Sequence, residues 1–214
     1  MKSTLFNMVA VLFCITLISS AGVGLVNMIT VEPIAEAKQK AVNDAVLAVL
    51  PAFDNKEITD LEIDAMPIKV YTATAEGKTV GYAVESMTKS GFNGVVKLMV
   101  GFAPSGEVLN VNVIQQAETP GLGTKMCDEG NPLISSIKGQ NLEQKKLVNG
   151  VLAVTKDGGD IDALTAATIS SRAYVDAVNR AYMAYKSVTT GTEPTDVATG
   201  ASAVEHTQKG GNNE

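Results

Sequence analysis

The sequence predicts an α+β protein, in which an N-terminal transmembrane helix precedes one domain with helices packed on an antiparallel sheet. Three observations predict this architecture. A long uncharged apolar run comes first, β-rich runs joined by short turns follow, and an amphipathic helical run lies near the end. The expected organisation is an anchor over residues 1–31, a domain over residues 32–186 and a disordered polar tail over residues 187–214.

The apolar run carries no charged residue from Ser3 to Val31. A transmembrane helix needs about 20 mostly apolar residues. A cleaved signal peptide is the alternative, but its apolar core spans only about 7–15 residues, whereas this run continues to Ile29. We therefore favour an uncleaved, single-pass anchor. Lys2 precedes the run and Glu32 follows it, so the positive-inside rule puts the N-terminus in the cytoplasm and the domain outside the inner membrane.

The elements of the domain follow from periodicity and turn residues. Apolar residues at helical spacing predict a helix over 34–50, which Pro51 ends. Alternating apolar residues with Gly or Pro in the intervening turns predict antiparallel strands. Their ranges are 68–74, 79–85, 94–102, 108–114 and, later, 149–155. The clearest helix is expected over 171–187, because Tyr174, Val178 and Tyr185 fall on one apolar face.

Composition excludes several functional classes. The net charge of −6 without a basic stripe argues against nucleic-acid binding. Cys14 and Cys127 are far apart, and His206 is the only histidine, so neither a zinc or iron–sulfur site nor a histidine-dependent triad is expected. We predict no metal site. The chain's own side chains are poor candidates for catalysis, which indicates a borrowed cofactor or no catalysis.

A hydroxyl-rich run over residues 162–171 immediately precedes the last predicted helix. Ser or Thr at a helix start usually caps free backbone N–H groups. A helix start is also an anion site, since those N–H groups and the helix dipole both face it. The run is therefore either a polar cap, with Ser170 and Ser171 in that role, or a phosphate site.

A second stretch, Glu118–Gly123, directly follows the predicted strand 108–114. Pro120 sets a turn, and the glycines permit close approach of the backbone. The stretch is either an ordinary Pro-Gly turn or a loop on which a flat ring rests, with Leu122 as an apolar contact.

The two stretches, in this order and behind one anchor, resemble a known family. It includes the G subunit of the Rnf electron-transport complex and the C subunit of the sodium-pumping NADH:quinone reductase, which share an FMN-binding domain. The resemblance spans most of residues 1–186. It depends on the anchor, on Ser90–Gly94 before a strand, on Glu118–Gly123 and on Asp162–Thr168.

The resemblance implies that FMN is joined through its phosphate to Thr168 as a covalent phosphoester. It also implies that a flavin transferase makes the bond from FAD, and that this enzyme recognises Asp162 and Thr165. Where the family has glycine this chain has Ala166, which adds a Cβ where backbone freedom is expected. The predicted cofactor-binding residues are Glu118, Thr119, Gly121, Leu122, Gly123, Leu164, Thr165, Ala167 and Thr168.

The implied function is a membrane flavoprotein subunit that relays electrons in the ion-translocating ferredoxin:NAD oxidoreductase and is not catalytic alone. Its implied partners are the other membrane subunits, the flavin transferase and membrane lipid. Two alternatives remain. One is the equivalent C subunit of the sodium-pumping reductase, and the other is a membrane-tethered assembly domain without cofactor, which Ala166 alone favours.

Overall fold

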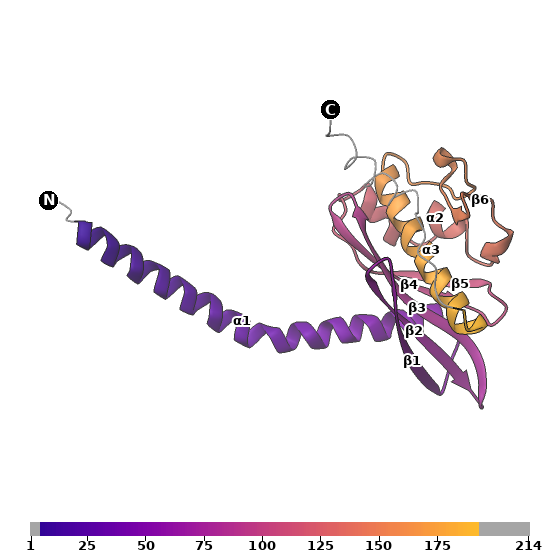
Figure 1. Ribbon diagram of the computed structural model, residues 1–214, viewed down its shortest axis with the longest axis horizontal. Helices are drawn as coiled ribbons and strands as arrows, with labels where there is room; N and C mark the ends of the chain where they lie inside the picture. The colour runs from indigo at the N-terminus through magenta and orange to yellow at the C-terminus, as the bar shows by residue number, and fades with distance from the viewer. Residues whose placement is uncertain (1–4, 193–214) are drawn as a thin grey trace. The chain divides into compact units, whose positions relative to one another are not determined.

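The computed structural model describes residues 5–192 (Figure 1). The chain divides into two compact units, residues 1–42 and 43–214, and each is described by itself. Helix α1 (Leu5–Val49) makes up the first unit and, from Asn43 onward, contributes its end to the second. The predicted tail over 187–214 falls largely outside the described residues.

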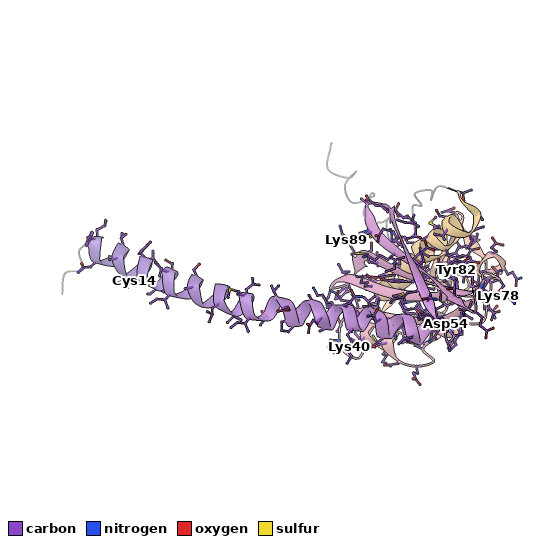
Figure 2. All side chains as sticks on the ribbon, turned by 90° about the horizontal axis from the view of Figure 1, so that it is seen from below. Cys14, Lys40, Asp54, Lys78, Tyr82 and Lys89 are labelled. Atoms are coloured by element: carbon purple, nitrogen blue, oxygen red, sulfur yellow. The ribbon has the colours of Figure 1, made fainter. Side chains whose placement is uncertain are left out.

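Helix α1 is long and apolar enough to cross a membrane, judged by length and composition. An 18-residue window reaches a mean hydropathy of 2.4, and none of that window is buried within the protein. Side chains project from α1 on all sides, among them Cys14 (Figure 2). The predicted apolar helix is confirmed. It is continuous with the helix predicted over 34–50, because Pro33 removes one backbone hydrogen bond without ending the helix.

The second unit is built on a five-stranded antiparallel sheet with strand order β1-β2-β3-β4-β5. Its strands are β1 (Asn55–Ile63), β2 (Met66–Ala75), β3 (Lys78–Gly91), β4 (Gly94–Phe102) and β5 (Val108–Gln115). The four strands predicted between 68 and 114 are confirmed. Strand β1 was not predicted, because it is an edge strand whose first six residues carry little apolar alternation.

Helix α3 (Thr168–Thr190) lies along one face of this sheet, as Figure 1 shows. Phe102 of β4 stacks on Tyr185 of α3 with ring centroids 4.8 Å apart, and Tyr82 of β3 meets the same ring edge-on at 5.3 Å. The predicted α+β class is therefore confirmed. The helix begins three residues before the predicted start at 171, which changes the role of its first hydroxyls.

The end of α1 covers the opposite face of the sheet. Successive strand residues point to opposite faces, and Gly81 and Gly101 each precede an aromatic residue that faces α3. A Cβ built on Gly101 would overlap the backbone of Val49, and one on Gly81 would lie 2.9 Å from Leu50. The sheet therefore lacks side chains where α1 makes its closest approach.

Residues 116–167 connect the sheet to α3 through short elements. These are η1 (Gly123–Cys127), α2 (Pro132–Ser135), η2 (Leu142–Gln144), β6 (Leu147–Val148), β7 (Val151–Leu152) and η3 (Thr155–Asp157). The strand predicted over 149–155 is wrong in extent. Asn149 and Gly150 have positive φ and form the turn of the small β6–β7 hairpin, as an Asn-Gly pair favours.

The middle of α3 carries a buried charged cluster. Arg180, only 1% exposed, pairs with Asp176 one turn earlier and with Asp64 in the β1–β2 turn, at 3.0 Å. Thr88 of β3 also donates to Asp176, at 2.6 Å. The cluster ties α3 to two parts of the sheet and satisfies buried charge with several partners.

Candidate functional site

The loop Glu118–Gly123 leaves β5 as a closed turn. The N–H of Leu122 donates to the carbonyl of Thr119 at 3.1 Å, and the N–H of Gly121 donates to Oγ1 of Thr124 at 2.9 Å. These local bonds hold the turn and leave the Leu122 side chain 40% exposed. The loop thus presents an apolar side chain on an ordered backbone.

Glu118 lies inside the protein and joins three segments. Its Oε1 accepts from the N–H of Asn93 in the β3–β4 turn at 3.1 Å, and its Oε2 accepts from the hydroxyl of Ser170 in α3. Its exposed fraction is only 4%. Because both carboxylate oxygens receive protein donors, Glu118 fixes the loop against the sheet turn and α3.

Gly123 allows this close assembly. A Cβ at Gly123 would lie 2.5 Å from Oγ of Ser170 and 2.6 Å from Cβ of Glu118. Such distances are far inside van der Waals contact, so any larger residue would push the loop away from α3. Only glycine fits into the space at position 123.

The run before α3 contains a strained residue. Ala166 has φ of 60°, in the left-handed region that L residues other than glycine, Asn and Asp rarely adopt. This is the position where the sequence departs from the glycine of the resembled family. The backbone of this chain is therefore left-handed at position 166 and carries a Cβ there.

The expected capping role of Ser170 and Ser171 is wrong, because α3 starts at Thr168 and Ala167 occupies the N-cap without a side-chain bond. Ser171, fully buried, donates to the carbonyl of Ala167 and accepts from the N–H of Leu164, both at 2.9 Å. From the first turn of the helix, Ser170 therefore holds the 118–123 loop through Glu118, and Ser171 holds the run that precedes α3.

Thr168 is the first residue of α3 and is partly exposed. Its Oγ1 accepts a hydrogen bond of 2.8 Å from Nζ of Lys156 in η3. The first N–H groups of a helix have no partner within it, and here the N-cap residue makes no side-chain bond to them. The hydroxyl thus sits beside backbone donors and an ammonium group, which together suit an anion.

The two predicted stretches meet at one hollow of about 140 Å³. Three of its lining residues are large, exposed hydrophobics from separate segments: Phe92 in the β3–β4 turn is 61% exposed, Leu122 40% and Ile169 47%. Its full lining is Phe92, Thr119, Leu122, Gly123, Ala166, Ala167, Thr168, Ile169 and Ser170.

Comparison with known proteins identifies the domain in which this hollow lies. Residues 91–183 match the family model of the FMN-binding domain. The chain is 35% identical to the G subunit of the ion-translocating oxidoreductase complex of Shewanella baltica, over 85% of this chain and 89% of that one. The chain belongs to the family of these G subunits. It is also 45% identical to the G subunit of Shewanella oneidensis over 59% of this chain and 58% of that one, and 34% identical to that of Vibrio cholerae over 77% and 82%.

The resemblance stated from the motifs is therefore confirmed, and the domain match supports FMN as the cofactor. All residues that line the hollow lie within the matched region. Their chemistry suits such a group, because large apolar side chains line the same hollow as Thr168, whose hydroxyl lies next to anion-binding donors.

The structure separates the predicted site residues into two groups. Thr119, Leu122, Gly123, Ala167 and Thr168 line the hollow. The others do not line it: Glu118 and Leu164 are buried, whereas Gly121, Asp162 and Thr165 are exposed. The exposed pair Asp162 and Thr165 is accessible to another protein.

Five residues at the site were not among the predicted binding residues, namely Phe92, Lys156, Ala166, Ile169 and Ser170. The sequence does indicate a special role for Phe92, since a large aromatic residue occupies a turn between two strands, where small polar residues are usual. No sequence pattern marks Lys156 as a site residue, because an isolated lysine in a loop is usually solvated. Its proximity to Thr168 depends on how residues 153–167 fold back.

Two larger hollows, of about 610 and 370 Å³, lie elsewhere in the domain. The first is lined mainly by β5 and residues 126–138, and the second by residues 142–152 and the later turns of α3. Neither contains a predicted site residue. Within residues 5–192, no group of three or more His, Cys, Asp and Glu side chains could hold a metal ion.

Proposed function

We propose that this chain is a membrane-anchored flavoprotein subunit that relays electrons through FMN in an ion-translocating oxidoreductase complex. Its family and its FMN-binding domain support this role, and they do not favour either alternative. The named relatives are subunits of a complex, and we place this chain among the other membrane subunits of such a complex. The flavin carries the redox chemistry, and the protein sets its position and access.

We propose further that the FMN is covalent, joined by a phosphoester to Thr168. The observation that carries this proposal is the meeting of the 118–123 loop and Thr168 at one hollow, with the threonine at a helix N-terminus that has no side-chain cap. A phosphodiester there keeps one negative charge, which the helix dipole stabilises by about 0.3–1 kcal/mol. Attachment through the phosphate leaves the flavin ring chemically unmodified, and the ring is then placed against Leu122 and Phe92.

The attachment requires a second protein in this proposal. A flavin transferase takes FMN from FAD and recognises Asp162 and Thr165, both of which are exposed. We place α1 in the cytoplasmic (inner) membrane in contact with lipid, with the N-terminus inside and the domain outside. Free FMN is scarce there, so a covalent bond prevents loss of the cofactor by mass action.

The test is expression of the full chain with and without a flavin transferase. The expected result is in-gel flavin fluorescence and an FMN-sized mass increase only when the transferase is present. Thr168→Ala should abolish both signals, whereas Thr155→Ala, which removes an exposed hydroxyl from the neighbouring η3 turn, should retain both. Covalent flavin on the Thr168→Ala variant would refute the attachment site, and a wild type that never gains flavin would refute the covalent proposal.

A further inference from the structure

Lys156 contacts the hydroxyl of Thr168, with 2.8 Å between Nζ and Oγ1. It comes from η3, twelve residues earlier in the chain. An exposed hydrogen bond between a lysine and a neutral hydroxyl contributes little to stability. The hydrogen bond between Lys156 and Thr168 is therefore better explained by a role in ligand binding than by a role in stability.

The backbone that carries Lys156 is held by a closed turn. The N–H of Thr155 donates to the carbonyl of Ile161 at 2.9 Å, and that of Gly159 donates to the carbonyl of Val154 at 3.1 Å. Val154 and Ile161 are each only 1% exposed and anchor both ends of the turn in the core. Lys156 thus extends from an ordered base.

An ion pair attaches the same turn to α3. Asp157 accepts two hydrogen bonds from Arg172, at 2.8 Å from Nε and 2.6 Å from Nη2. Arg172 lies four residues after Thr168, hence on the same side of the helix. The residue next to Lys156 is therefore fixed to the helix that carries Thr168, which keeps the ammonium and the hydroxyl in register.

The charges of this turn leave the Lys156 ammonium available to a ligand at Thr168. Asp157 is neutralised by Arg172, and Lys156 directs its charge at the threonine. Asp160, also in this turn, lies 3.9 Å from Lys145. The Lys156 ammonium can therefore balance the single negative charge of a phosphodiester. The first N–H groups of α3 stabilise the same charge.

We infer that Lys156 is a positioning residue for flavin attachment and binds the phosphodiester that the attachment forms. The inference rests on the proposed function, in which Thr168 carries FMN. In the transfer, Oγ1 of Thr168 attacks the FMN phosphorus of FAD. The Thr168 O–P bond forms, the bond from that phosphorus to the AMP phosphate oxygen breaks, AMP leaves, and the hydroxyl proton passes to solvent.

In this step Lys156 acts as a hydrogen-bond donor and takes up no proton. Its N–H donor stabilises the negative charge that develops on the threonine oxygen and then balances the charge of the diester. Nothing is oxidised or reduced. The prediction is therefore a requirement for positive charge at position 156, which arginine can meet and methionine cannot.

The experiment follows attachment over time with purified full-length protein in detergent, flavin transferase and FAD. Lys156→Met should slow the appearance of in-gel flavin fluorescence about tenfold or more, as expected for loss of a charge-assisted hydrogen bond. Lys156→Arg should restore most of the rate. Lys78→Met removes the same charge from the exposed start of β3 (Figure 2) and should leave the rate unchanged.

The outcomes separate this inference from the proposed function. Equal rates for wild type and Lys156→Met, with no attachment to Thr168→Ala, would overturn the role of Lys156 and leave the attachment site intact. A Lys156→Arg variant as slow as Lys156→Met, with the wild-type melting temperature, would overturn the charge requirement. Absence of flavin from the wild type would instead reject covalent attachment itself.

Discussion

The middle of α3 and its first turn differ in burial and in the pairing of their polar groups. Its middle is buried against the sheet and holds Arg180 and Asp176 with 1% exposure each, every charge having a partner. Its first turn leaves Ile169 47% exposed, has no side-chain cap and follows a residue with strained backbone. This difference indicates that the stability of the helix comes from its middle, which allows its start to remain open for a ligand.

The largest expected effect breaks the buried part. Arg180→Ala removes one partner of a buried ion pair and leaves Asp176 in the core, so we expect a loss of about 3–5 kcal/mol in the free energy of unfolding. Chemical denaturation would measure it. Arg172→Ala, which removes a partly exposed arginine near the start of the helix, is the matched control and should cost under about 1 kcal/mol. Similar losses from both changes would contradict the comparison.

The second effect concerns the packing of the site itself. Gly123→Ala places a Cβ against Ser170 and Glu118, and we expect it to cost about 1–3 kcal/mol in the free energy of unfolding. It should also reduce flavin attachment, because the loop moves away from α3. The control is Gly130→Ala, where a Cβ meets no atom within 4 Å and only the positive φ opposes the change. It lies outside the hollow and should retain attachment. If only Gly130→Ala impairs attachment, the proposed assembly is wrong.

A smaller effect of opposite sign is expected at Ala166. Ala166→Gly removes the steric cost of the left-handed backbone, which exceeds the added entropy of the unfolded chain. We expect a gain of about 0.5–1 kcal/mol in thermal or chemical unfolding, together with unchanged or faster flavin attachment. Ala163→Gly, in the same run but without positive φ, should destabilise the protein or leave it unchanged. A lower free energy of unfolding for the Ala166→Gly variant would show that the backbone at Ala166 is not strained.

The smallest effect is a pH dependence at the turn that carries Lys156. The hydrogen bonds from Arg172 hold the pKa of Asp157 below its ordinary value. Its stabilising contribution is therefore present above the unfolded-state pKa of about 4 and lost as the pH falls through the folded-state pKa. Asp157→Asn should cost under about 1 kcal/mol at pH 7 and nothing in strong acid. A pH-independent difference in denaturation midpoint would contradict this linkage.

Local patterns predicted most elements and missed others for identifiable reasons. The strands between 68 and 114 alternate clearly and are present, whereas β1 begins with mostly polar, exposed residues and gives no such signal. Asn149 and Gly150 were included in a strand although this pair favours a turn. The serines 170 and 171 were assigned to a cap because the helix start was placed three residues late.

The sequence by itself determined the apolar N-terminal helix, the α+β class, the family and the two stretches that contain Thr168 and the 118–123 loop, because each depends on residue type and local spacing. The tertiary structure decided that Glu118 is a buried brace, that Phe92 and Ile169 complete the hollow, and that Lys156 reaches Thr168. The bonds from Lys156 to Thr168 and from Ser170 to Glu118 join residues 12 and 52 positions apart. They depend on how the chain folds back on itself, which no local pattern contains.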